Sequence, residues 1–180
     1  VYTTKLILLM STYYAKKILL QDGWNNDTYF EVNHGLINNI SQKKPPKDKI
    51  SKHLDIVIPG LCNAHSHSFQ RALSGHTEHI MGQSEDNFWT WRKKMYQIVD
   101  NLDISALSAI VCQAYKEMIS RGYTQVVEFH YVHRDDDQKD INNKLFHSIL
   151  KAAKETGINL IYTPILYQRG GFLDEELSVQ

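Results

Sequence analysis

The sequence predicts an α/β protein in which a short β-rich segment precedes a series of parallel strands and helices. Residues 11–40 contain short apolar and aromatic runs separated by turn-forming clusters, a pattern typical of antiparallel strands. From residue 103 to residue 165, helical and strand-like patterns alternate, which indicates right-handed βαβ units. The alternation alone does not distinguish a closed barrel from an open sheet.

Residues 1–55 form the predicted β-rich segment. The composition of the whole chain limits the classes of protein to which it can belong. The first ten residues are too short an apolar run for a membrane span or an ordinary signal peptide, so we expect a cytoplasmic protein. Since the first methionine is Met10, residues 1–9 are interpreted as an upstream extension. The 20 basic and 20 acidic residues balance, which argues against a nucleic-acid partner. Cys62 and Cys112 form no Cys-x-x-Cys pair and fit a reducing compartment.

The central stretch is an apolar run, Ile56–Leu61, that leads into His65-Ser-His67. Residues i and i+2 of a strand share a face, so both imidazoles can leave the strand end toward one metal ion. Zinc accepts neutral imidazole readily, which makes His65 and His67 candidate metal ligands. Pro59-Gly60 suggests a kink in this strand. The alternative is a surface His-Ser-His without a ligand, because the motif alone is weak.

The remaining elements follow from hydrophobic spacing and from capping residues. We expect a loop over 68–87, helices over 88–99, 103–121 and 141–156, and strands over 125–131 and 159–165. Asp103 or Ser105 can cap the second helix, and Gly122 and Gly157 end the second and third. His53, His76 and His79 are interpreted as structural or surface residues.

Four blocks of this sequence resemble the formimidoylglutamate deiminases, a family within the amidohydrolase superfamily. They are His65–Gly75, Asn87–Arg92 with Met95-Tyr96, Gly122–Thr124 with Glu128–Tyr131, and Leu166–Phe172. The resemblance covers roughly residues 56–172 and implies a metal-dependent hydrolase (β/α)8 barrel preceded by a small β-sandwich. Because such a barrel needs roughly 250 residues, we expect residues 56–180 to carry only its first strands and helices.

The resemblance also implies a function and site residues. It implies zinc-dependent hydrolysis of N-formimino-L-glutamate to N-formyl-L-glutamate and ammonia in histidine degradation, with His65 and His67 as Zn²⁺ ligands. Gln70 and Arg92 match positions that contact the glutamate part of the substrate, and Tyr131 matches a position that hydrogen-bonds it. The alternatives are a loop-bracing amide for Gln70 and a surface arginine over an aromatic ring for Arg92.

Several assignments stay open at this stage. Glu128 either acts directly or braces the metal site as a buried, paired carboxylate, His130 is expected to point away from the pocket, and Arg169 is a possible substrate contact. The family's remaining metal ligands and its acid/base residues are expected beyond Gln180, so residues 1–180 alone should bind zinc poorly and be inactive. The complete protein is expected to be a homodimer. The alternative functions are another amidohydrolase deaminase, or an inactive truncated chain.

Overall fold

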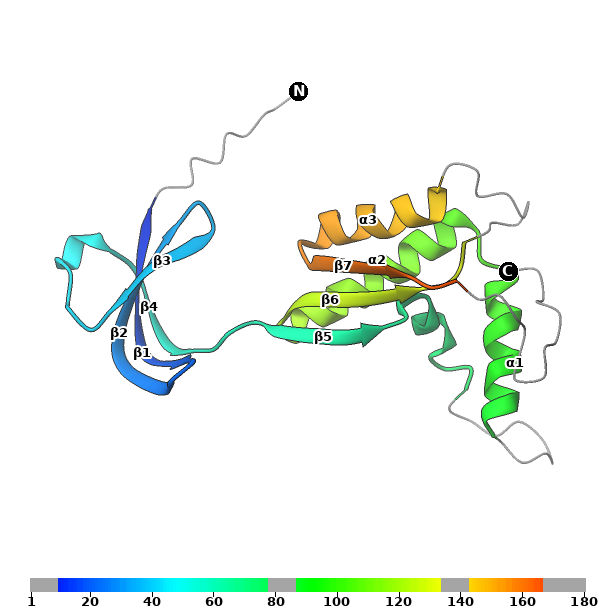
Figure 1. Ribbon diagram of the computed structural model, residues 1–180, viewed down its shortest axis with the longest axis horizontal. Coiled ribbons are helices and arrows are strands. Elements are labelled where there is room, and N and C mark those ends of the chain that lie inside the picture. Colours follow the sequence, from blue (N-terminus) through cyan, green and yellow to red (C-terminus); the bar gives the residue numbers. More distant parts are fainter. Residues whose placement is uncertain (1–9, 78–86, 134–142, 167–180) are drawn as a thin grey trace, which may run out of the picture. The chain divides into compact units, whose positions relative to one another are not determined.

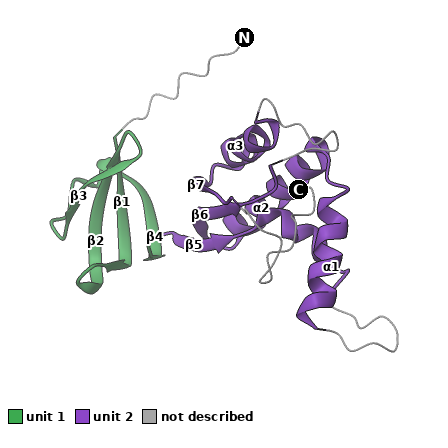
Figure 2. Ribbon diagram, turned by 45° about the vertical axis from the view of Figure 1, so that its right-hand side comes forward, with its two compact units in different colours: residues 1–59 green, residues 60–180 purple. Residues whose placement is uncertain are grey.

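A computed structural model describes residues 10–77, 87–133 and 143–166 (Figure 1). The chain divides into two compact units, Val1–Pro59 and Gly60–Gln180 (Figure 2). No helix within the described ranges is long and apolar enough to cross a membrane.

The first unit is a four-stranded sheet with the order β3-β2-β1-β4. Its strands are β1 (Ser11–Leu20), β2 (Gly23–Asn33), β3 (Leu36–Ser41) and β4 (Ile50–Val57), with a short 3-10 helix, η1 (Lys47–Lys49), before β4. The predicted antiparallel pairing is confirmed for β1, β2 and β3, whereas β4 joins the edge of β1 in parallel. Ala15, Ile18 and Phe30 form the small core of this sheet.

The second unit contains a parallel sheet with the order β5-β6-β7 (Figure 1). Its elements are β5 (Leu61–Ser66), η2 (Ser68–Leu73), α1 (Phe88–Val99), α2 (Ile104–Ser120), β6 (Tyr123–His130), α3 (Lys144–Thr156) and β7 (Asn159–Pro164). The predicted alternation of strands and helices is therefore confirmed. The described strands form an open sheet, not a closed barrel.

Local sequence explains where the helices begin and end. The Asn87 side chain accepts hydrogen bonds from the N–H groups of Trp89 and Thr90 and forms a capping box at the start of α1. The Asp103 carboxylate accepts the Ala106 N–H at 2.6 Å and caps α2. Helix α3 ends at Gly157, whose φ of 79° is a left-handed conformation that glycine adopts at little cost.

The core of the second unit lies between the sheet and the helices α2 and α3. The fully buried residues Leu107, Val111, Leu145 and Ile149 of these helices pack together with Val126 of β6. The central strand β6 lies between β5 and β7, and it contributes residues to the candidate site described below.

Two sequence predictions are corrected by the structure. The expected single strand through Ile56 is two strands, because Ile56 belongs to β4 of the first unit and β5 starts at Leu61. Pro59 has no N–H to give to a ladder, and Gly60 lies so close to Thr124 that a Cβ there would be 2.2 Å from Thr124 Oγ1. The predicted loop over 68–87 is also wrong at its start, which forms the 3-10 helix η2.

Candidate active site

The two histidines at the end of β5 converge. His65 is the penultimate residue of β5 and His67 is the N-cap of η2, so their side chains leave the same face of the chain. Their Nε2 atoms are 3.0 Å apart. The His65 ring also stacks on Phe129 of the neighbouring strand β6, with ring centroids 4.4 Å apart and an interplanar angle of 25°. The predicted shared face of His65 and His67 is therefore present.

A backbone carbonyl fixes the tautomer of His67. The Nδ1 atom of His67 lies 2.7 Å from the carbonyl oxygen of Phe129. A carbonyl oxygen only accepts, so Nδ1 carries the proton and donates it. In the neutral ring, the Nε2 atom of His67 then carries a lone pair, which accepts the hydrogen bond of 3.0 Å from the Nε2 atom of His65. A carbonyl partner on the other ring nitrogen is the usual support of a metal-ligating histidine.

This geometry fits two ligands of one zinc ion. Two nitrogens that each lie about 2.0–2.1 Å from a tetrahedral zinc are roughly 3.3 Å apart, close to the separation of these Nε2 atoms. Zinc needs at least one further protein ligand, and the described residues contain no group of three or more potential ligands. His65 and His67 alone are therefore too few ligands for a zinc site.

Gln70 and Tyr131 meet beside the histidine pair. The Gln70 amide donates a hydrogen bond of 2.9 Å to the Tyr131 hydroxyl, which in turn donates to the sulfur of Met95 at 3.3 Å. The Tyr131 ring centroid is 5.2 Å from that of His67 and 5.1 Å from that of Phe69. Two residues that sequence analysis assigned to substrate binding are thus hydrogen-bonded to each other next to a candidate metal ligand.

Arg92 lies on α1, one helical turn before Met95. Its Nε and Nη2 atoms donate to the Tyr96 hydroxyl at 3.2 and 3.0 Å, and its guanidinium lies over the rings of Trp89 and Tyr96. Residues three apart on a helix share a face, so Arg92 is on the same side of α1 as the methionine that contacts Tyr131. A guanidinium over two aromatic rings of its own helix also agrees with the alternative given for Arg92, a surface arginine over an aromatic ring.

Glu128 is fully buried on the face of β6 opposite to Phe129 and the histidine pair. Its Oε1 accepts the N–H and the hydroxyl of Ser68, each at 2.7 Å, and its Oε2 accepts the Tyr115 hydroxyl at 3.3 Å. Burial raises the pKa of the Glu128 carboxyl, and the hydrogen bonds from Ser68 and Tyr115 oppose this rise in pKa. Burial, followed by the nearby Glu128 charge, raises the pKa of the Tyr115 hydroxyl above its usual range.

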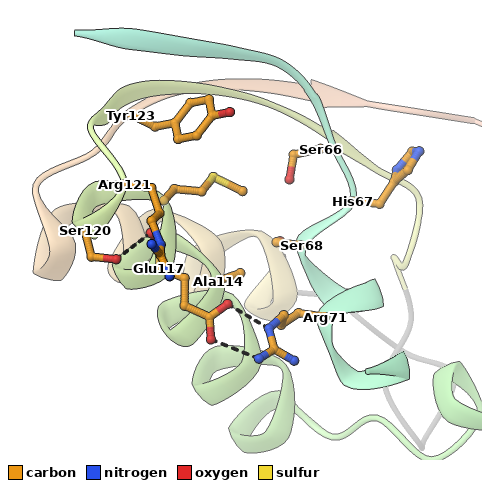
Figure 3. Close-up of a pocket in the computed structure, with 10 residues that line it drawn as sticks. Ser66, His67, Ser68, Arg71, Ala114, Glu117, Ser120, Arg121 and Tyr123 are labelled. Carbon is orange, nitrogen blue, oxygen red and sulfur yellow. Dashed lines mark hydrogen bonds and ion pairs between the residues drawn. The ribbon is translucent and has the colours of Figure 1, made fainter. Parts of the chain in front are cut away.

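A cavity of about 610 Å³ lies between the end of β5, η2 and α2 (Figure 3). Arg71 and Glu117 form a two-bond ion pair across it, with Nε–Oε2 and Nη2–Oε1 distances of 2.8 and 3.0 Å. The His67 imidazole points away from the other residues of the cavity in Figure 3. This cavity is therefore on the helix side of the sheet, whereas the imidazoles of the candidate metal site are on the opposite side.

The other predicted residues are placed as follows. His130 is buried on the same face of β6 as Glu128, away from Phe129 and the histidine pair, in agreement with its prediction. His76 is exposed just after η2, and His79 and Arg169 lie outside the described residues.

Sequence reasoning missed the partners of Glu128. Ser68 and Tyr115 were not singled out, although the alternation Ser66-His-Ser68 already placed two small hydroxyl residues on the face opposite the histidines.

Comparisons with known proteins agree with this architecture. The sequence profile of the amidohydrolase family matches residues 56–178. Over 166 residues the chain is 40% identical to formimidoylglutamate deiminase of Pseudomonas aeruginosa, covering 91% of this chain and 36% of that protein. It is 28% identical over 114 residues to 5-methylthioadenosine/S-adenosylhomocysteine deaminase of Halalkalibacterium halodurans, covering 60% of this chain and 25% of that protein.

Solved structures give the same result for the fold. An amidohydrolase from Brucella melitensis matches with a TM-score of 0.83 and 29% identity, over 93% of this chain and 38% of that one. Atrazine chlorohydrolase from Arthrobacter aurescens TC1, solved in complex with zinc, matches with a TM-score of 0.67 and 15% identity, over 86% of this chain and 35% of that one. The chain thus spans little more than a third of the length of these structures.

Proposed function

Because the chain belongs to the amidohydrolase family, we propose that the complete protein is a zinc-dependent deiminase acting on N-formimino-L-glutamate. It would convert this substrate and water to N-formyl-L-glutamate and ammonia. The observation that carries the proposal is the contact between the candidate metal ligand His67 and Tyr131, whose hydroxyl is hydrogen-bonded to Gln70. The 40% identity to a formimidoylglutamate deiminase supports this choice of substrate.

His65 and His67 would hold the zinc ion through their Nε2 atoms. A bound zinc ion would supply a water whose pKa is lowered toward neutrality. The chain's own contribution is to orient the two ligands. Phe129 does this twice, since its ring stacks on His65 and its carbonyl oxygen accepts the Nδ1–H of His67. Further ligands and the acid/base group are expected outside residues 1–180.

Gln70, Arg92 and Tyr131 would bind and orient the substrate. N-formimino-L-glutamate carries two carboxylates and a formimino group, so it needs both cationic and neutral hydrogen-bond donors. The Arg92 guanidinium is suited to bidentate binding of a carboxylate. The Tyr131 ring lies next to His67, and its hydroxyl can bind a carboxylate or the formimino nitrogen. Gln70 orients that hydroxyl through the 2.9 Å hydrogen bond.

The test is release of ammonia by the complete protein that contains this chain, loaded with zinc. N-formimino-L-glutamate is compared with guanine, a chlorotriazine and S-adenosylhomocysteine, which represent other deaminases and hydrolases of the family. Since hydrolysis of a chlorotriazine releases chloride and not ammonia, its turnover is followed by chloride release. We expect ammonia from N-formimino-L-glutamate at a kcat/KM well above that for the others. Turnover of one of the other compounds, without turnover of N-formimino-L-glutamate, would contradict the proposal.

A variant pair tests the assignment of Arg92. Arg92→Lys replaces the planar guanidinium, which can bind a carboxylate through two parallel hydrogen bonds, by a single ammonium group. Because a charge-assisted hydrogen bond is lost, we expect KM for N-formimino-L-glutamate to rise about 10–100-fold. Arg121→Lys is the matched control, since Arg121 follows α2 on the exposed helix side of the sheet. Equal KM values for the two variants would remove Arg92 from the substrate site.

The expected homodimer and cytoplasmic location belong to the same proposal. Both concern the complete protein, and light scattering on the purified complete protein tests the homodimer directly.

A further inference from the structure

The Glu128 carboxylate lies on the helix-facing side of β6, between the sheet and α2. It is fully buried, and the groups that donate hydrogen bonds to it are neutral, namely Ser68, Tyr115 and the Ser66 side chain. Placing a carboxylate in a core is costly unless its oxygens accept hydrogen bonds, and a hydrophobic residue of similar size would avoid that cost. The core of this unit is otherwise built mainly from apolar side chains. The groups that the Glu128 carboxylate binds are therefore the place to look for its role.

Glu128 holds the peptide that follows His67. The last residue pair of the β5–β6 ladder is Ser66 with Glu128. Beyond that pair the chain turns into η2, and the Ser68 N–H is accepted by the Glu128 carboxylate at 2.7 Å instead of by a strand carbonyl. The Ser68 hydroxyl reaches the same oxygen at 2.7 Å. The carboxylate thus extends the attachment of the chain to β6 by two residues after the ladder ends.

The next residue of β6 holds the imidazole itself. The Phe129 carbonyl oxygen accepts the Nδ1–H of His67 at 2.7 Å. Two successive residues of β6 therefore hold this part of the chain from both faces of the sheet. Phe129 binds the His67 ring, and Glu128 binds the backbone N–H of the next residue. If the Ser68 bonds were lost, the turn into η2 could shift and the His67 Nε2 would no longer point steadily at the His65 Nε2.

We propose that Glu128 is a positioning residue for the zinc ligand His67, acting through Ser68. This inference rests on the proposed function, because it takes His67 as a zinc ligand. Groups that orient metal ligands from outside typically contribute about 10–100-fold to metal affinity. A carboxylate with a purely structural role would affect unfolding but not the zinc affinity of the folded protein.

The test is the zinc dissociation constant of the complete protein, measured by chelator competition on samples shown to be folded by circular dichroism. For Glu128→Met we expect the constant to rise about 10–100-fold. Glu128→Gln should restore most of the affinity, because its carbonyl oxygen can accept both Ser68 bonds. Glu155→Met is the matched control on the exposed face of α3 and should bind zinc like the wild type. Wild-type affinity in folded Glu128→Met would overturn the proposal.

If Glu128→Met does not fold, Ser68→Ala decides the question. It removes the hydroxyl bond and keeps the backbone bond, so we expect the zinc dissociation constant to rise about 2–10-fold. An unchanged constant would overturn the proposal.

The same measurements separate this inference from the proposed function. Tight zinc binding without ammonia release from N-formimino-L-glutamate would refute the proposed reaction. The role of Glu128 would still be decided by comparing the zinc dissociation constants of the wild type and the variants. If the protein is an active deiminase and its zinc affinity is unchanged when Glu128 is replaced, the positioning role alone is refuted. A wild-type protein that binds no zinc would refute both.

Discussion

Replacing Tyr131 by phenylalanine separates the chemical role of its hydroxyl from the packing role of its ring. Tyr131 is 9% exposed, and its ring would keep its contacts with His67 and Phe69. The hydroxyl would lose the 2.9 Å bond from Gln70 and the weak 3.3 Å contact to the Met95 sulfur. One neutral hydrogen bond contributes about 0.5–1.5 kcal/mol, so the free energy of unfolding should fall by that amount.

The effect on catalysis should be larger than the effect on folding. If the hydroxyl binds a charged group of the substrate, its loss costs about 1.5–3 kcal/mol, or about 10–150-fold in kcat/KM. Urea unfolding and ammonia release by the complete protein give the two numbers. Tyr123→Phe is the control, because Tyr123 begins β6 roughly 26 Å along the strand from Tyr131. A kcat/KM that falls by less than a factor of two would show that the hydroxyl does not bind substrate.

Three further predictions concern the fold of the second unit. Gly60→Ala places a Cβ 2.2 Å from Thr124 Oγ1, so urea unfolding should show a loss of about 1–3 kcal/mol that Thr124→Gly largely relieves. Hydrogen bonds from Arg71 lower the pKa of Glu117 to about 2. The stabilising contribution of the ionised Glu117 carboxylate is therefore complete above pH 4.5 and is lost as the pH falls toward 2. The stability difference between wild type and Glu117→Gln should shrink over that range, and a constant difference would contradict it. Ile149→Ala empties a fully buried position and should cost about 2–5 kcal/mol in the same unfolding assay.

Features encoded by neighbouring residues were predictable from the sequence. Asp103 and Gly157 mark helix termini through local hydrogen bonding and backbone conformation: α2 begins directly after Asp103, and α3 ends at Gly157. The shared face of His65 and His67 likewise follows from the two-residue period of a strand.

Features set by distant partners were not predictable in the same way. Ile56 looked like the start of the strand that carries the histidines, but it pairs with β1, about 40 residues earlier in the chain. The bond between Ser68 and Glu128 joins residues 60 positions apart. A single sequence shows the residue types in such pairs but not their proximity, which depends on how the parallel strands align.

The claim that His65 and His67 bind one zinc ion can be tested most directly by anomalous diffraction at the zinc edge, on crystals of the complete protein. We expect an anomalous peak about 2.0–2.1 Å from the Nε2 atoms of both histidines. A well-ordered histidine pair with no anomalous peak between the two rings, or with the zinc bound elsewhere, would contradict the proposed metal site.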